Sequence, residues 1–124
     1  QNILIKNEKI KFIDYQSSRL GPPSYDISSL LWDSYFEIPE DLRGSLLNYY
    51  KNIMGKNLPK DFDESLKYIR CQRHFQALGA FSFLGLKSGK EHFLKFIEKG
   101  KELLINDLEE LKNFNSFKIL TKIL

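Results

Sequence analysis

Apolar and lysine positions interleave in two short runs near the start of the chain, residues 3–6 (ILIK) and 9–13 (KIKFI). Both runs are rich in β-branched residues, and only the polar pair Asn7-Glu8 separates them. This pattern predicts a β-hairpin with a two-residue turn. Because a tight hairpin returns the chain to its starting end, we expect Asn2 and Asp14, which bracket the two runs, to lie side by side.

Further along the chain, apolar residues recur every three to four positions, the spacing of one face of a helix. A first short helix is expected to begin near Ser24 or Asp26, either of which could cap it. A second is expected between Pro39, which opens it, and Gly55, which lies just past its end.

The longest predicted helix covers residues 62–86 and carries apolar residues on more than one face, which implies burial on several sides. Its small residues are expected to permit close helix approach; they are Ala77, Gly79 and Ala80. Residues 90–99 and 101–113 follow as two helices or as one helix kinked at Gly100. Residues 117–124 are expected to form a last amphipathic turn or two.

The predicted fold is therefore mainly α, a short N-terminal β-hairpin followed by a bundle of about five to six helices. No repeat, low-complexity stretch or domain boundary interrupts the pattern. We therefore predict a single domain over residues 1–124, divided into a hairpin (1–14), a loop (15–25) and a helical bundle (26–124).

The composition is that of a globular chain, with 42% apolar and 28% charged residues among 124. The sequence contains no membrane-length apolar run and no signal peptide, so no membrane partner is expected. A single cysteine excludes an internal disulfide and fits a cytoplasmic location. The net charge of +3 comes from lysines scattered along the predicted helices, so no nucleic-acid partner is expected.

Three polar positions near the start could carry chemistry: Asn2 before the first strand, Asp14 after the second, and Asp26 at the first helix. An amide oxygen beside a carboxylate is a reasonable pair of hard ligands for Mg²⁺, which takes few protein oxygens. The same residues also fit plainer roles as a chain-end residue, a turn residue and a helix cap. Taken alone, they leave both interpretations open.

Other reactive side chains favour structural roles. His74 lies among aromatic residues in the longest helix and is expected to be packed or hydrogen-bonded. Cys71 has no acid–base partner nearby in sequence and is expected to be buried. The sequence contains neither zinc-ligand spacing nor a glycine-rich phosphate loop.

The order Asn-Ile-Leu, hairpin, Phe-Ile-Asp-Tyr-Gln, loop, Gly-Pro-Pro-Ser-Tyr-Asp in residues 2–26 resembles the aminoglycoside-phosphotransferase-like family, which includes choline and aminoglycoside kinases. In that family a loop His-x-Asp-x-x-x-x-Asn precedes the hairpin, and a strand-end Asp acts like the Asp of the protein-kinase Asp-Phe-Gly motif. The resemblance implies the C-terminal part of a kinase-like lobe, with ATP and Mg²⁺ as cofactors. It implies that Asn2 and Asp14 bind the metal.

The same resemblance assigns supporting roles. Gly21, Tyr25 and Asp26 match the pattern Gly-Pro-x-x-Tyr-Asp, which braces the catalytic loop in that family. The proton-accepting Asp would lie before Gln1, so no catalytic residue is expected within this sequence. We therefore expect a truncated fragment that is inactive by itself, and whose exposed hairpin edge favours self-association.

Residues 72–81 and 87–90 resemble one branch, the cell-wall amino-sugar kinases, which phosphorylate N-acetylmuramate or N-acetylglucosamine at the anomeric hydroxyl. A small-molecule hydroxyl substrate is therefore expected, with an amino sugar favoured. Gln16, Arg19 and Arg73 are candidates for the substrate side of the site. That branch has Asp-Phe-Gln-Asp-Ala where residues 14–18 of this chain read Asp-Tyr-Gln-Ser-Ser.

Two other functions remain open. A non-catalytic helical interaction module derived from such a lobe would fit the serines at positions 17 and 18, and it would bind neither nucleotide nor Mg²⁺. A nucleic-acid binder, suggested by the mildly basic charge, would lose affinity steeply as salt is added.

Overall fold

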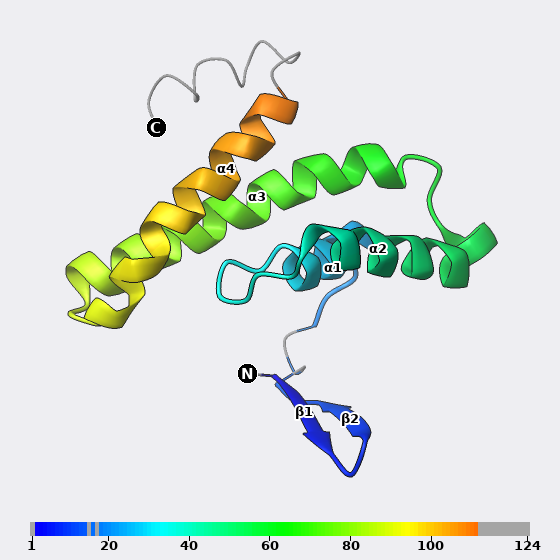
Figure 1. The fold of residues 1–124 in the computed structure, drawn as a ribbon, viewed down its shortest axis with the longest axis horizontal. Helices are drawn as coiled ribbons and strands as arrows, with labels where there is room; N and C mark the ends of the chain where they lie inside the picture. The colour runs from blue at the N-terminus through cyan, green and yellow to red at the C-terminus, as the bar shows by residue number, and fades with distance from the viewer. Residues whose placement is uncertain (1, 15, 17, 112–124) are drawn as a thin grey trace.

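The computed structural model describes residues 2–14, 16 and 18–111, and it places a β-hairpin ahead of a group of helices (Figure 1). The predicted fold class is confirmed, with four α-helices in the described part. The turns expected over residues 117–124 lie outside the described residues. In chain order the elements are β1 (Ile3–Lys6), β2 (Lys9–Phe12), α1 (Ser24–Leu31), α2 (Glu40–Met54), the 3₁₀ turn η1 (Gly55–Asn57), α3 (Phe62–Ser82), the π-helical turn η2 (Phe83–Lys87), the 3₁₀ helix η3 (Glu91–Phe96) and α4 (Ile97–Glu110).

The hairpin is antiparallel and closes at the predicted turn. Asn7 and Glu8 both have positive φ, 50° and 61°, as a type I′ turn requires. Because side chains alternate across a strand, one face is apolar and the other mainly basic. The apolar face carries the cross-strand pairs Ile3–Phe12 and Ile5–Ile10, and the other face the pairs Leu4–Lys11 and Lys6–Lys9.

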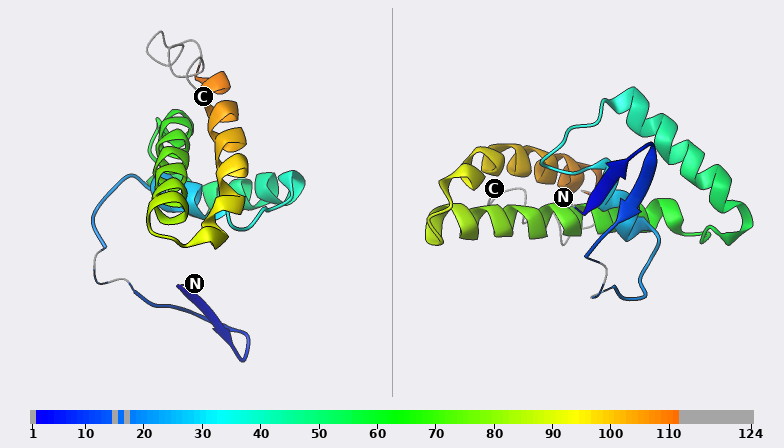
Figure 2. Two further views of the ribbon diagram at one scale, coloured as in Figure 1. Left: turned by 90° about the vertical axis from the view of Figure 1, so that its left-hand side faces the viewer. Right: turned by 90° about the horizontal axis from the view of Figure 1, so that it is seen from below.

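Neither face of the hairpin is covered by the described helices. Every residue of both strands is exposed. Figure 2 shows the hairpin projecting from the helices at the end of a long connection. An exposed strand edge can pair with another strand, and self-association through it stays a prediction.

The predicted ends of α2 are confirmed. Pro39 precedes the first helical residue, and two carboxylates in the first turn offset the positive end of the helix dipole. Gly55 ends the helix with a φ of 48°, a region that favours glycine. The helix packs on one side, where the Tyr50 ring lies 5.9 Å from the ring of Phe62 at the start of α3.

The most deeply buried residues lie between α3 and α4, which cross closely (Figure 1). Leu104 and Leu108 of α4 have no exposed surface, and they pack with Cys71 of α3 and with Leu111. None of the described helices combines the length and apolar character needed to cross a bilayer.

A buried ionic network centred on Asp107 also joins α3 to α4. Its carboxylate accepts a hydrogen bond from Arg70 Nε at 2.5 Å and lies 2.5 Å from His74 Nδ1. His74 Nε2 lies 3.0 Å from the carbonyl oxygen of Trp32, beyond the end of α1. The imidazole ring of His74 therefore bridges α4 to the segment that follows α1. His74 is thus a hydrogen-bonded core residue, as predicted.

The prediction that two helices meet, or that one helix kinks, at Gly100 is wrong, because α4 begins at Ile97 and continues through Gly100. Gly100 is buried against α3, where a Cβ would lie 3.4 Å from Leu78 Cδ1. Its lack of a side chain permits the close helix approach that was expected from the small residues of α3. Of those, Gly79 faces open space and Ala80 is exposed.

Cys71 is buried, as predicted, and burial raises the pKa of its thiol to about 11. Because the reactive form is the thiolate, about one thiol in a thousand is ionised at about pH 8. We therefore expect the native protein to resist alkylation of Cys71 by iodoacetamide at this pH and to react after unfolding in urea. Peptide mass spectrometry checks this, and rapid labelling of the native protein would contradict it.

Candidate functional site

The base of the hairpin brings Asn2 and Asp14 together. Asn2 Nδ2 donates a hydrogen bond to Asp14 Oδ2 at 3.3 Å, and the backbone amide of Ile13 donates to the carbonyl oxygen of Asn2 at 3.0 Å. The pairing of the two strands therefore continues one position past each of them. This continuation is why two residues 12 positions apart meet, as the two-residue turn predicts.

Asp14 has a left-handed backbone conformation, with a φ of 63°. Such values are uncommon for residues other than glycine, although aspartate tolerates them better than most. The residue follows β2 closely and turns the chain out of the strand direction. Residues held in sparsely populated backbone conformations cluster at functional sites. The backbone conformation of Asp14 therefore supports a functional role for its carboxylate.

Gln16 completes this group at the hairpin base. Its Nε2 donates to Asp14 Oδ1 at 2.6 Å, so each carboxylate oxygen of Asp14 accepts one side-chain amide hydrogen. Gln16 was expected on the substrate side, and the structure places it directly against the candidate metal ligand. Its hydrogen bond can fix the orientation of the carboxylate.

This group fits a divalent cation bound through few protein atoms. Asp14 supplies carboxylate oxygens, and Asn2 supplies an amide oxygen, the hard ligands that Mg²⁺ prefers. All three side chains of the group are exposed, which leaves room for phosphate and water. Over residues 2–14, 16 and 18–111, no cluster of three His, Cys, Asp or Glu side chains offers a metal site of another kind.

The remaining candidates lie on the helical part. Arg73 of α3 donates from Nη1 to the Tyr25 hydroxyl at 2.9 Å, and its guanidinium carbon lies 4.9 Å from the centroid of that ring. The same nitrogen donates to Gln76 Oε1 at 2.6 Å. Arg73 was expected on the substrate side, but its contacts hold Tyr25 in the first turn of α1.

The expectation that Ser24 or Asp26 caps α1 is wrong. The residue before the helix is Pro23, and no side chain caps the helix. Ser24 is already helical, and its hydroxyl pairs with that of Ser65 at 2.8 Å, which ties α1 to α3. Asp26 is exposed in the first turn, and a Cβ at Gly21 would meet open space, so nothing in the structure explains a glycine there.

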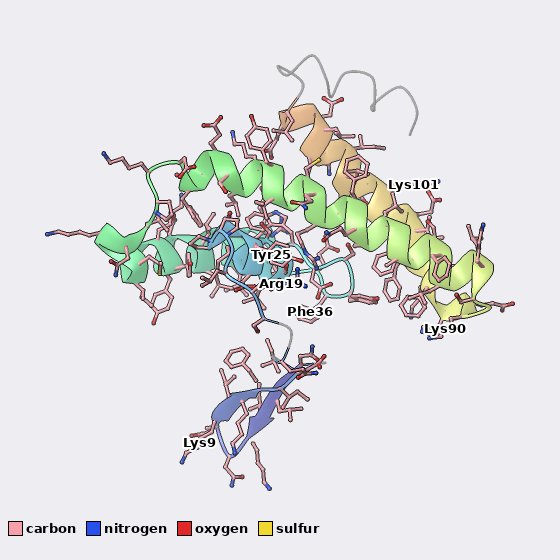
Figure 3. The ribbon with its side chains drawn as sticks, turned by 180° about the vertical axis from the view of Figure 1, so that it is seen from behind. Lys9, Arg19, Tyr25, Phe36, Lys90 and Lys101 are labelled. Carbon is pink, nitrogen blue, oxygen red and sulfur yellow. The ribbon has the colours of Figure 1, made fainter. Side chains whose placement is uncertain are left out.

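The site candidates thus form two groups, and no hydrogen bond or ion pair between described residues joins them. Figure 3 shows Lys9 at the far tip of the hairpin, and Arg19 and Tyr25 at the helical part. The connection between the groups includes positions 15 and 17, which lie outside the described residues.

A cavity of about 210 Å³ lies beside the connection from α1 to α2. Its lining includes Trp32, whose ring lies 5.5 Å from the Arg43 guanidinium. Ser34 Oγ and Arg43 Nε are buried without a hydrogen-bond partner among the described residues. At the same cavity, a hydrogen bond to Glu102 raises the pKa of Lys99. The local sequence feature that could have indicated this cavity is the aromatic content of residues 32–36, which is high for a segment that connects two helices.

The comparisons with known proteins agree with one another on the family. The profile of the phosphotransferase enzyme family matches residues 1–62, which is half of the 124 residues. The N-acetylmuramate/N-acetylglucosamine kinase of Neisseria meningitidis serogroup B is 29% identical over 99 residues, 75% of this chain and 30% of the relative. The kinase of the same name from Pseudomonas aeruginosa is 28% identical over 100 residues, 76% of this chain and 30% of the relative.

The chain spans about 30% of the length of these curated relatives. No solved structure gives a significant match. The family profile covers both strands of the hairpin, the Asn2–Asp14 pair and the whole of α1 and α2. The resemblance predicted from the sequence is therefore confirmed, and the chain belongs to the phosphotransferase enzyme family.

Proposed function

We propose that the intact protein containing this chain is an ATP- and Mg²⁺-dependent kinase that phosphorylates a hydroxyl of a small polar molecule. An N-acetylated amino sugar is the favoured acceptor, because the curated relatives named above are N-acetylmuramate/N-acetylglucosamine kinases. The proposal also includes the predicted cytoplasmic location, where ATP is available.

The observation that carries the proposal is the pairing of Asn2 with Asp14 at the base of the hairpin. Phosphoryl transfer needs little covalent chemistry from the protein and depends on positioning and on stabilising negative charge. A carboxylate beside an amide is suited to hold metal ions, and the pair lies within the segment that matches the family profile. A purely structural turn would not need both side chains to meet.

In this proposal Asp14 and Asn2 hold the metal with their side-chain oxygens, and Gln16 keeps the carboxylate of Asp14 in place. The chemistry that a bound Mg²⁺ would supply is neutralisation of negative charge on the transferring phosphate. Arg73 acts at a distance, through Tyr25, by fixing the first turn of α1. The proton of the acceptor hydroxyl goes to an aspartate that the family pattern places five residues before Asn2.

Residues 1–124 do not include that aspartate, so we expect no phosphoryl transfer from this segment on its own. A non-catalytic interaction module remains the second candidate. The observation in its favour is the pair of serines at positions 17 and 18, where the amino-sugar branch has Asp-Ala. Nucleotide binding distinguishes the two, since a scaffold of that kind should bind neither ATP nor Mg²⁺.

An acceptor panel tests the proposal. The intact protein is incubated with ATP, Mg²⁺ and one of N-acetylmuramate, N-acetylglucosamine, choline or an aminoglycoside, and ADP release is followed. We expect kcat/KM for an N-acetylated amino sugar to exceed that for choline or the aminoglycoside by about tenfold or more, the discrimination that one or two extra polar contacts provide. Transfer to choline or the aminoglycoside at an equal rate would contradict the substrate class, and no transfer to any acceptor would favour the interaction module.

A further inference from the structure

Helix α2 carries an exposed apolar stripe that no described part of the chain covers. Leu42, Leu46, Tyr49 and Ile53 are 48%, 39%, 65% and 64% exposed. Their spacing of four, three and four positions places them on one side of the helix, in the repeat by which two helices pack along a seam.

The stripe is separate from the face by which α2 packs on its own chain. The packed face repeats at the same spacing one position further on, and its members are partly buried: Arg43, Leu47, Tyr50 and Met54. A helix that packs on one side needs only one such face. Figure 2 shows α2 diverging from α3 towards its own N-terminal end, at the edge of the helical part. Among the described residues, nothing covers the second apolar face of α2.

The polar residues around the stripe favour a partner of the same sequence. Ser45 and Asn52, beside the stripe, are uncharged and exposed, and the cores of protein interfaces are depleted in charge and enriched in tyrosine. Charge lies at the ends instead, with Asp41 in the first turn and Lys56 just after the last. Two copies of α2 in antiparallel orientation would bring Asp41 of each beside Lys56 of the other.

We propose that two copies of this protein pair through α2, antiparallel about a two-fold axis near the middle of the helix. Leu42 then packs against the partner's Ile53, and Leu46 against the partner's Tyr49. A two-fold interface is self-complementary, which a stripe symmetrical about its centre with opposite charges at its ends provides. The proposal does not depend on catalytic activity and applies equally to a kinase or a scaffold.

Sedimentation velocity of the intact protein over a range of concentrations tests this interface. We expect the wild type to dimerise reversibly and Tyr49→Glu to raise the dimer dissociation constant at least tenfold. Asn48→Glu is the control, since it introduces the same charged residue at an exposed α2 position outside the stripe, and it should shift the constant less than threefold. A monomeric wild type, in which another part of the protein covers the stripe, would overturn the proposal. Equal dimerisation of Tyr49→Glu would also overturn it, because the contact would then lie elsewhere, such as at the hairpin.

Cysteine cross-linking tests the orientation. The variants Leu42→Cys and Ile53→Cys are purified separately, mixed and oxidised mildly; the native Cys71 is buried and does not compete. Antiparallel pairing predicts disulfides between the two variants and none within either one. Two copies of position 42 would lie about 16 Å apart along the helices, at 1.5 Å per residue, which is beyond disulfide reach. Efficient cross-linking of Leu42→Cys with itself would overturn the antiparallel arrangement.

Discussion

Replacing Asp107 by alanine is expected to lower the free energy of unfolding by about 3–5 kcal/mol, the cost of removing one partner from a buried ion pair. The carboxylate contacts both Arg70 and His74, and all three side chains are buried. Arg70 keeps an ion pair with Glu110 at 2.9 Å, but Glu110 is half exposed and compensates only in part. His74 keeps only the Trp32 carbonyl among the partners that the structure describes.

Native-state hydrogen exchange of the α3 and α4 amides in the intact protein measures this loss where it occurs. Glu98→Ala is a suitable control on the same helix, because the ion pair of Glu98 with Lys101 is exposed and should contribute less than about 1 kcal/mol. Asp107→Asn preserves the shape of the side chain. Its loss of unfolding free energy should therefore lie between the losses for Asp107→Ala and Glu98→Ala. If Asp107→Ala and Glu98→Ala had equal effects, the network would not hold α3 and α4 together.

The hairpin and α2 could be predicted from sequence because their signals are local. Asn7 and Glu8 separate two β-branched runs, and a turn this short fixes which residues lie opposite each other. The meeting of Asn2 with Asp14 follows directly from that register. Pro39 and Gly55 act through their own backbone preferences, so they mark the ends of α2 without help from the rest of the fold.

The features that the sequence did not predict depend on distant residues. A glycine inside a helix costs about 1 kcal/mol relative to alanine, and at Gly100 the close packing of α4 on Leu78 outweighs that preference. His74 finds its partners 33 and 42 positions away. The cavity beside the α1–α2 connection is likewise lined by residues as far apart as Leu31 and Leu103. Local periodicity holds no information about such pairings.

Replacing Asp14 by asparagine in the intact protein is expected to lower kcat by about 100-fold to 1000-fold, the usual effect of removing one group that stabilises transition-state charge. The change keeps the size of the side chain and removes its charge. Asparagine also tolerates the positive φ of Asp14, so the fold of the hairpin should be unaffected. The loss should therefore arise from weaker metal binding rather than from unfolding.

Asp61→Asn is the matched control, because it makes the same substitution at an exposed position before α3, away from the hairpin. It should retain activity within about twofold, since surface substitutions away from special features have small effects. Gln16→Ala removes the hydrogen bond to Asp14 Oδ1 without removing a metal ligand. Gln16→Ala should lower kcat by an amount between those of Asp61→Asn and Asp14→Asn. A higher Mg²⁺ concentration should partly restore the activity.

The most direct test of the central claim is the affinity of the intact protein for ATP, measured by titration calorimetry with and without Mg²⁺. The wild type and Asp14→Asn are compared under the same conditions. The proposed role of Asp14 predicts that Mg²⁺ strengthens ATP binding by the wild type and that most of this strengthening is lost in Asp14→Asn. Equal Mg²⁺ dependence in the two proteins, or no ATP binding by either, would contradict it.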